Sequence, residues 1–345
     1  MSLQKTITSL LLKLPDSILI AMSGGKPVVR DGRQLDARFQ FIAAAAAKQP
    51  APDPFTPEFA RGGTDLLTDL FGGPVENGVS FSDMVIPAAG RVIPARAYRP
   101  TDQRPQAPLM VFYHFGGGVV GNVGTCHAFC SIIAKIVGCP VLSIEYRLAP
   151  EHQWPAGLND AIDSFIWGRD NADQFGAPKG LASAGGDSMG GNFTAILALE
   201  MKLRKLAQPV VQLLIYPATD ITDETGSMQS CSDAYPLTKQ IMDWFMANYL
   251  PTDADQNDVR ISPAKSGDLS GLAQAIIVTA GHDPLRDQGM AYCDMLKSAG
   301  VASQSKCYDS LAHGFTAYTG SVPDADTACR EIASSVLASY RQQGY

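Results

Sequence analysis

A short segment places a serine where it could act as a nucleophile. Residues 186–191 read Gly-Asp-Ser-Met-Gly-Gly and directly follow the run 180–184, which predicts a strand. A strand that turns sharply into a helix at Gly-x-Ser-x-Gly holds the serine hydroxyl clear of the backbone, where a base and a substrate can reach it. Glycines on both sides permit such a turn. The segment predicts a nucleophilic Ser188, which requires a base, an acid and an oxyanion site.

An acid and a base follow this serine in the order that strand-turn-helix enzymes with a serine nucleophile use. His313 lies just after the last predicted strand, and Asp283 just after the strand predicted at 275–279. A carboxylate at Asp283 could accept the imidazole N–H and fix the tautomer whose other nitrogen faces Ser188. Asp287 is the rival acid, but its place at the start of a helix favours an N-terminal cap.

Backbone amides could supply the oxyanion site. One would come from Met189, the residue after the serine, and others from the loop 114–118, which reads His-Phe-Gly-Gly-Gly. Glycines let main-chain amides approach a ligand closely. The same loop also supports a second hypothesis, because residues Gly116–Gly121 match G-x-G-x-x-G after a strand and Glu145 ends the next strand. That pattern would indicate an NAD(P)-binding oxidoreductase, but it leaves the serine, aspartate and histidine unexplained.

Apolar runs that alternate with helical patterns predict the elements that position these residues. The pattern predicts an α/β fold with a mostly parallel, eight-stranded sheet and helices on both faces. The predicted strands are 81–87 and 91–99, as an antiparallel start, then 109–114, 140–147, 181–185, 210–216, 275–279 and 302–308. The later predicted helices are 157–167, 190–205, 287–299 and 324–341.

Two segments interrupt this alternation. Residues 1–75 are helical in pattern and then broken by prolines, and residues 220–269 hold one amphipathic helix at 238–250. We interpret the first as the N-terminal part of a helical cap and the second as a further cap segment over the ends of the strands. The catalytic domain would then comprise 76–219 and 270–345. The alternative is that both segments only cover a sheet edge.

Composition narrows the class of protein. The 345 residues carry a net charge of −7 without a basic run, which argues against a nucleic-acid partner. Seven scattered cysteines indicate neither zinc ligands nor a disulfide frame, and they fit a reducing compartment. No run is long enough to insert across a membrane, and the N-terminal apolar stretch is too interrupted for a secretory signal. We therefore expect a cytoplasmic enzyme, with an edge strand near 302–308 that could pair in a homodimer.

Residues from about 108 to 315 resemble the hormone-sensitive-lipase family of carboxylesterases, also called bacterial family IV, within the α/β-hydrolase fold. The resemblance rests on the loop at 114–118, the serine segment and the surroundings of Asp283 and His313. Further matching segments are Tyr-Arg-Leu-Ala-Pro-Glu-His at 146–152, Trp-Pro-Ala at 154–156 and Ser-Pro at 262–263. Several such motifs in order are more specific than any one of them.

The resemblance implies a carboxylesterase that needs neither cofactor nor metal and acts on a small-molecule ester of short to medium chain. Ser188 would be the nucleophile, His313 the general base and then acid, and Asp283 its orienting partner. A third hypothesis is a receptor of the same fold that binds a small molecule without catalysis, as the related gibberellin receptors do. Those receptors lose the catalytic histidine that His313 supplies here.

The resemblance also implies that the amides of Gly116, Gly117 and Met189 hold the oxyanion. The chain departs from the family at two places. Phe115 takes the position of the family's first glycine, and Gly118 takes the position of an aromatic residue, so both should change the wall of the substrate pocket. Met189 replaces the usual alanine, which would leave its amide in place and narrow the pocket.

Overall fold

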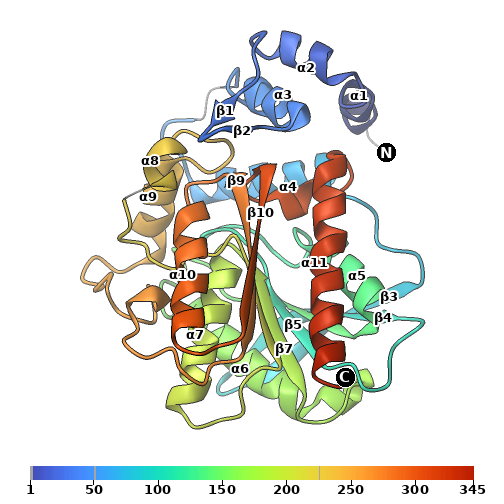
Figure 1. Ribbon diagram of the computed structural model, residues 1–345, viewed down its shortest axis with the longest axis vertical. Coiled ribbons are helices and arrows are strands. Elements are labelled where there is room, and N and C mark those ends of the chain that lie inside the picture. Colours follow the sequence, from blue (N-terminus) through green and yellow to red (C-terminus); the bar gives the residue numbers. More distant parts are fainter. Residues whose placement is uncertain (1–2, 50–51, 225) are drawn as a thin grey trace.

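A twisted sheet with helices on both faces forms the centre of the computed structural model, which describes residues 3–49, 52–224 and 226–345 (Figure 1). Within that part of the chain the sheet has eight strands in the order β10-β9-β8-β7-β5-β6-β4-β3. Strands β3 and β4 pair antiparallel, and β4 pairs antiparallel with β6. The other neighbouring strands are parallel. The predicted fold class is confirmed, including the antiparallel start.

The strands lie close to their predicted positions. Their bounds are β3 (Val79–Ala88), β4 (Arg91–Pro100), β5 (Leu109–Tyr113), β6 (Val141–Ile144), β7 (Ala182–Asp187), β8 (Val211–Ile215), β9 (Gln274–His282) and β10 (Ser303–Ala312). Every residue of β5 is buried, as expected of a central parallel strand covered on both faces. A separate hairpin of β1 (Val29–Arg30) and β2 (Arg33–Gln34) was not predicted, because two-residue strands carry no periodic pattern.

Helices cover the two faces of the sheet in two groups. One face carries α5 (His127–Ile133) and α11 (Pro323–Gln342), and the other carries α6 (Ala156–Asp170), α7 (Met189–Leu203) and α10 (Arg286–Ser298) (Figure 1). Alternate side chains of β5 show why: Phe112 packs in the core with Phe129 of α5, whereas Val111 packs with Phe165 of α6. None of the described helices combines the length and apolarity needed to cross a membrane.

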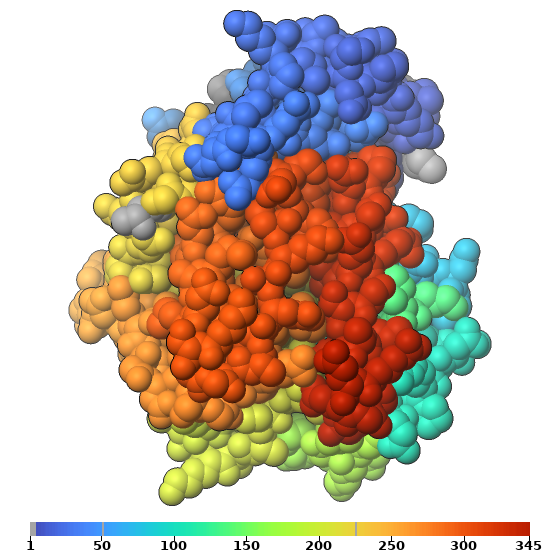
Figure 2. Space-filling model, viewed as in Figure 1, coloured from blue at the N-terminus to red at the C-terminus, as the bar shows by residue number. Residues whose placement is uncertain are grey.

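The remaining α-helices gather at the carboxyl ends of the strands. They are α1 (Leu3–Leu11), α2 (Asp16–Met22), α3 (Ala37–Ala46) and α4 (Pro57–Phe71) from the N-terminal segment, and α8 (Ser227–Ser230) and α9 (Lys239–Tyr249) from the second interruption. The N-terminal segment, blue in Figure 2, sits on the ends of β9, β10 and α11. A backbone hydrogen bond connects it to β10 there, because Asp36 N donates to Ser310 O at 2.9 Å.

The division into a cap and a catalytic domain remains a prediction. Parts of the predicted cap segments, namely residues 1–2 and 50–51 in the first and residue 225 in the second, lie outside the described residues. The helices of both segments lie at the same end of the sheet as the end of β7, where the predicted nucleophile follows. The last residues of the second segment instead reach the opposite end, where Asp268 lies 2.7 Å from Lys202 Nζ near the end of α7.

Candidate active site

The turn between β7 and α7 holds Ser188 in a strained conformation. Its φ is +57° and its ψ −114°, a region that side-chain-bearing residues rarely adopt. A Cβ on Gly186 would collide with the backbone of Gly190, and a Cβ on Gly190 would collide with the carbonyl of Tyr113. The two glycines of the pattern are therefore required by the close approach of the backbone around the serine.

Ser188, His313 and Asp283 lie in a continuous hydrogen-bonded series. His313 Nε2 lies 2.9 Å from Ser188 Oγ, and His313 Nδ1 lies 2.8 Å from Asp283 Oδ2. The second oxygen of Asp283 accepts the backbone N–H of Leu285 at 2.8 Å, which fixes the carboxylate. Because an ionised carboxylate can only accept, Nδ1 carries the proton and Nε2 is free to accept the serine proton. Such an arrangement can activate a serine for attack on a carbonyl carbon.

Asp287 lies apart from this series. It is the second residue of α10, and its Oδ2 accepts the backbone N–H of Ser227 at 2.8 Å, where α8 begins. Its Oδ1 accepts from Arg286 Nε at the same distance. The expectation that Asp287 caps its own helix was therefore wrong in detail. It caps the neighbouring α8 instead, because the start of α8 packs against the first turn of α10.

Three buried polar side chains form a hydrogen-bonded cluster next to Ser188 and His313. Asp187 Oδ2 accepts from Thr316 Oγ1 at 2.7 Å and from Tyr216 Oη at 3.0 Å, and the two hydroxyl oxygens lie 2.6 Å apart. The Tyr216 ring lies 4.7 Å from the His313 imidazole, between centroids. Burial raises the pKa of the Asp187 carboxyl to about 6, although hydrogen bonds from Thr316 and Tyr216 moderate the rise. No sequence pattern singled out this group, because its members are far apart in the chain.

The glycine loop forms a compact turn beside the serine. Gly116, Gly117 and Gly118 have φ values of +126°, +62° and +75°, which favour glycine. Behind the loop, Tyr146 Oη donates to His114 O at 2.8 Å and the two rings stack at 4.1 Å. Desolvation lowers the pKa of His114 to about 4, so this imidazole is neutral near neutral pH.

The same loop does not have the form that binds a dinucleotide. Gly116 O accepts the N–H groups of Val119 and Val120, so the loop closes on itself, and α5 begins only at His127. A dinucleotide fingerprint needs the glycines to open directly into a helix whose N-terminus holds the pyrophosphate. Glu145 is also engaged, since its Oε2 accepts the N–H of Val123 at 2.7 Å. These contacts disfavour the oxidoreductase hypothesis.

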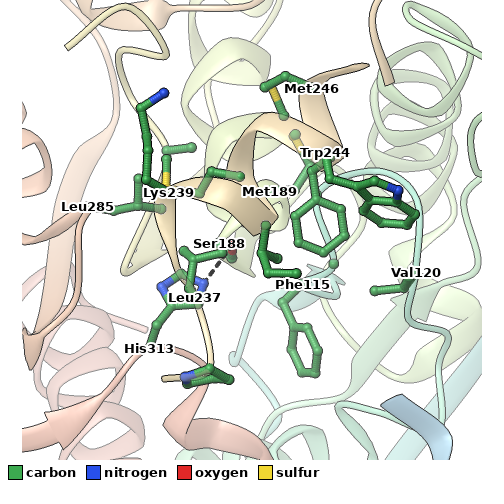
Figure 3. Close-up of a pocket in the computed structure, with 18 of the residues that line it drawn as sticks. Phe115, Val120, Ser188, Met189, Leu237, Lys239, Trp244, Met246, Leu285 and His313 are labelled. Atoms are coloured by element: carbon green, nitrogen blue, oxygen red, sulfur yellow. Dashed lines mark hydrogen bonds between the residues drawn. The ribbon is translucent and has the colours of Figure 1, made fainter. Parts of the chain in front are cut away.

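Ser188 and His313 lie at one wall of a largely apolar cavity of about 380 Å³. Figure 3 shows its labelled side chains converging around Ser188, with Phe115 and Val120 on one side and Leu285 on the other. Much of the cavity wall comes from α4, α9 and adjoining residues, including Phe55, Phe59, Met242, Trp244, Phe245 and Met246. The sequence predicted the helix at 238–250 as part of a cap segment, but it singled out none of these residues for the site.

The sequence predicted that two residues of the glycine loop, Phe115 and Gly118, line the substrate pocket, and the structure separates them. Phe115 lines the cavity, as do Gly116, Gly117 and Met189. Gly118 is not part of the cavity wall, because the ring of Tyr249 from α9 occupies the space where a Cβ on Gly118 would lie. The pocket role of Gly118 is therefore corrected: its lack of a side chain makes room for Tyr249, an aromatic ring supplied by another segment.

The described residues contain no group of three His, Cys, Asp or Glu side chains placed to hold a metal ion.

Comparisons with known proteins agree with this fold. Residues 110–317 match the model of the alpha/beta hydrolase fold family. The carboxylic ester hydrolase LipN of Mycobacterium tuberculosis is 38% identical, over 85% of this chain and 80% of its own length. The ethyl acetate hydrolase of Pseudomonas putida is 35% identical, over 69% of this chain and 76% of its own length. The structure of the ester-hydrolase EH1AB1 from the metagenome of Lake Arreo has a TM-score of 0.81 at 35% identity, covering 95% of this chain and 99% of that one.

The chain therefore belongs to the α/β-hydrolase family. Within that family it is an enzyme of the carboxylesterase class, and the resemblance to the hormone-sensitive-lipase group is confirmed.

Proposed function

We propose that the protein hydrolyses carboxylic esters through an acyl-enzyme, with Ser188 as nucleophile, His313 as general base and acid, and Asp283 as the residue that orients His313. The series of hydrogen bonds at 2.9 and 2.8 Å, set at the wall of the cavity, carries this proposal. An intact series also favours an enzyme over a receptor of the same fold, because binding alone does not require a base aligned with the serine.

In the first half of the reaction, Ser188 Oγ attacks the ester carbonyl carbon while its proton passes to His313 Nε2. The carbonyl oxygen becomes an oxyanion, for which the amides of Gly116, Gly117 and Met189 are the proposed donors. When the carbon–oxygen bond to the alcohol breaks, His313 returns the proton to the departing oxygen. Water then repeats the sequence on the acyl-enzyme, releasing the acid and restoring Ser188.

The proposed substrates are soluble esters of short to medium acyl chain. The cavity is enclosed by aromatic and thioether side chains of α4 and α9, which we propose act as the cap of the site. A volume near 380 Å³ suits a small ligand rather than a long extended chain. The name of the relative that hydrolyses ethyl acetate, a short ester, is in keeping with this size.

Hydrolysis of 4-nitrophenyl esters by the purified protein tests the proposal. Ser188→Ala should lower kcat for the butyrate ester by several orders of magnitude, because the nucleophile is lost and only binding and the oxyanion site remain. Near-normal turnover by that variant would contradict the mechanism. Across acetate, butyrate, octanoate and palmitate esters, kcat/KM should peak below palmitate, and a maximum at palmitate would contradict the proposed chain length.

A further inference from the structure

One arginine of the N-terminal segment reaches the glycine loop beside Ser188. Arg61 is the fifth residue of α4, and its Nε donates to Val119 O at 2.9 Å. Its Nη2 donates to Ala149 O at 2.9 Å, and Nη1 and Nη2 donate to the two carboxylate oxygens of Glu151 at 2.8 and 2.7 Å. Two of these contacts end on main-chain carbonyl groups, which an ion pair alone does not require. Arg61 therefore holds the main chain of the glycine loop as well as a carboxylate.

The peptide group that accepts from Arg61 holds a second peptide group of the loop. Val119 O and the N–H of Val120 belong to the same peptide group, and that N–H donates to Gly116 O at 3.0 Å. Gly116 O belongs in turn to the peptide group whose N–H is that of Gly117, a proposed oxyanion donor. A series of hydrogen bonds therefore runs from the guanidinium of Arg61 through two peptide groups to the N–H of Gly117.

A second branch converges on the same carbonyl oxygen. The N–H of Val119 also donates to Gly116 O, at 2.9 Å. The carbonyl oxygen of that peptide group, Gly118 O, accepts from Ala149 N at 2.8 Å. Because Arg61 holds Ala149 through its oxygen, both branches lead back to the same guanidinium.

The free end of the series lies at the cavity. Gly117 lines the cavity, and its N–H has no hydrogen-bond partner in the part of the chain that the structure describes. Hydrogen bonds in such a series polarise one another, so a cation at its start strengthens the donor at its end. A negative charge that develops on a carbonyl oxygen in the transition state is stabilised most by donors that are already oriented.

We propose that Arg61 is a positioning residue for the oxyanion site and acts through the two peptide groups on the N–H of Gly117. The N-terminal segment then contributes to the chemical step as well as to the wall of the cavity. This inference rests on the proposed esterase mechanism and adds to it a residue that acts only through others.

Arg61→Met removes every donor of the guanidinium and keeps an unbranched side chain. Its kcat for 4-nitrophenyl butyrate should fall about tenfold, less than the loss of a direct oxyanion donor causes, while KM stays within about twofold. A trifluoromethyl ketone binds as a tetrahedral adduct with an ionised oxygen, so its inhibition constant should rise by about the same factor as kcat falls. The inhibition constant of the matching methyl ketone, which binds without forming that oxyanion, should not change.

The pH dependence of kcat/KM separates this role from an effect on the triad. The acid limb of that profile reports the pKa of the essential base, which is His313 in the proposed mechanism. Because His313 is not part of the series from Arg61, the midpoint of the acid limb should be the same in Arg61→Met and the wild type.

Asp65→Ala is the matched control. Asp65 also lies on α4 and accepts from Asn122 Nδ2 at 2.8 Å, two residues beyond Val120, but this contact is outside the series. Its kcat and both inhibition constants should equal those of the wild type.

Arg61→Lys serves if Arg61→Met does not fold. A lysine keeps a charge beside Glu151 but lacks the planar fork that reaches the carboxylate and both carbonyl oxygens together. Its kcat should fall and its trifluoromethyl ketone constant should rise in the same proportion, both by less than in Arg61→Met.

A folded Arg61 variant with wild-type kcat would overturn the inference. A loss of kcat with an unchanged trifluoromethyl ketone constant would also overturn it, because the role would then be structural alone. If instead the wild type neither hydrolyses the butyrate ester nor binds the trifluoromethyl ketone, the proposed esterase function itself fails. The two failures are therefore distinguishable in the same experiment.

Discussion

Thr316 donates a 2.7 Å hydrogen bond to Asp187, which joins the residue before Ser188 to the turn that follows His313. Tyr216 donates to the same carboxylate oxygen while its ring lies against the imidazole. Ser188 and His313 lie 2.9 Å apart, the distance that the proposed proton transfer needs, and a second, fully buried set of contacts adjoins both. We regard Thr316 as a positioning residue.

Replacing Thr316 tests this connection. Thr316→Val keeps the shape of the side chain but removes the hydrogen bond, so kcat should fall about tenfold with little change in KM. Thr194→Val is the control, because the Thr194 hydroxyl is equally buried and donates to Gly190 O within its own helix, α7. A Thr316 variant that loses stability as the control does, yet keeps wild-type kcat, would contradict the positioning role.

The Asp187 carboxyl should make stability depend on pH. Three short oxygen–oxygen contacts join Asp187, Tyr216 and Thr316, and each needs one proton to be a hydrogen bond. The two hydroxyl groups supply two protons, so only a protonated Asp187 carboxyl supplies the third. Burial raises its pKa from 3.8 to about 6, so the folded state holds this proton more tightly than the unfolded state. The stabilisation is complete below the unfolded value and is lost as the pH rises through about 6.

Asp187→Asn isolates this dependence because it is uncharged at every pH. The free energy of unfolding of the variant, minus that of the wild type, should rise by about 3 kcal/mol between pH 3 and pH 7. Denaturant unfolding at a series of pH values measures the difference. A difference that stays constant across this range would show that Asp187 does not titrate there.

Asp283 and Asp287 offer a comparison of two acids four residues apart. Asp283→Asn should lower kcat by about 10⁴, because an amide can stabilise the wrong imidazole tautomer and cannot stabilise the imidazolium. Asp287→Asn should lower kcat by less than about tenfold, since this carboxylate contacts Ser227 and Arg286 rather than His313. Steady-state kinetics on one ester decide between them, and equal losses would withdraw the assignment of Asp283.

The order of strands and helices and the placement of Ser188, Asp283 and His313 could be predicted from the sequence. Parallel strands buried on both faces leave long apolar runs, and the glycines around Ser188 mark a turn that tolerates no side chain. Such patterns depend on neighbouring residues and can therefore be recognised in the sequence. They locate the ends of the strands, and because the carboxyl ends of parallel strands lie at one edge of the sheet, residues that follow these ends come close together.

The cavity walls that α4 and α9 contribute could not be predicted in the same way. Tyr249 fills the space above Gly118 although the two are far apart in the chain, and Trp244 Nε1 donates to Phe55 O at 3.0 Å across the two interruptions. Such contacts depend on how the N-terminal segment and α9 pack over the strand ends. The Asp187–Thr316 contact was missed for the same reason, because no local pattern links the two residues.

The proposed oxyanion site can be tested by two substitutions with opposite expected effects. Met189→Ala keeps the backbone amide, so kcat on the butyrate ester should change less than about tenfold, while longer acyl chains gain relative to it in the wider cavity. Gly117→Ala should abolish most activity, because its Cβ would collide with the Phe245 ring and φ is +62°. Acyl-chain profiles of both variants measure this, and comparable losses in the two would argue against a purely backbone contribution from Met189.

Labelling by a fluorophosphonate tests the central claim most directly. Such a reagent forms a stable bond with a serine only when a base activates that serine, so the modified residue reports the nucleophile itself. Mass spectrometry of the digested, labelled protein should place one adduct on Ser188, and His313→Ala should abolish the labelling. An unmodified Ser188 in a protein that hydrolyses esters, or an adduct on another residue, would contradict the account.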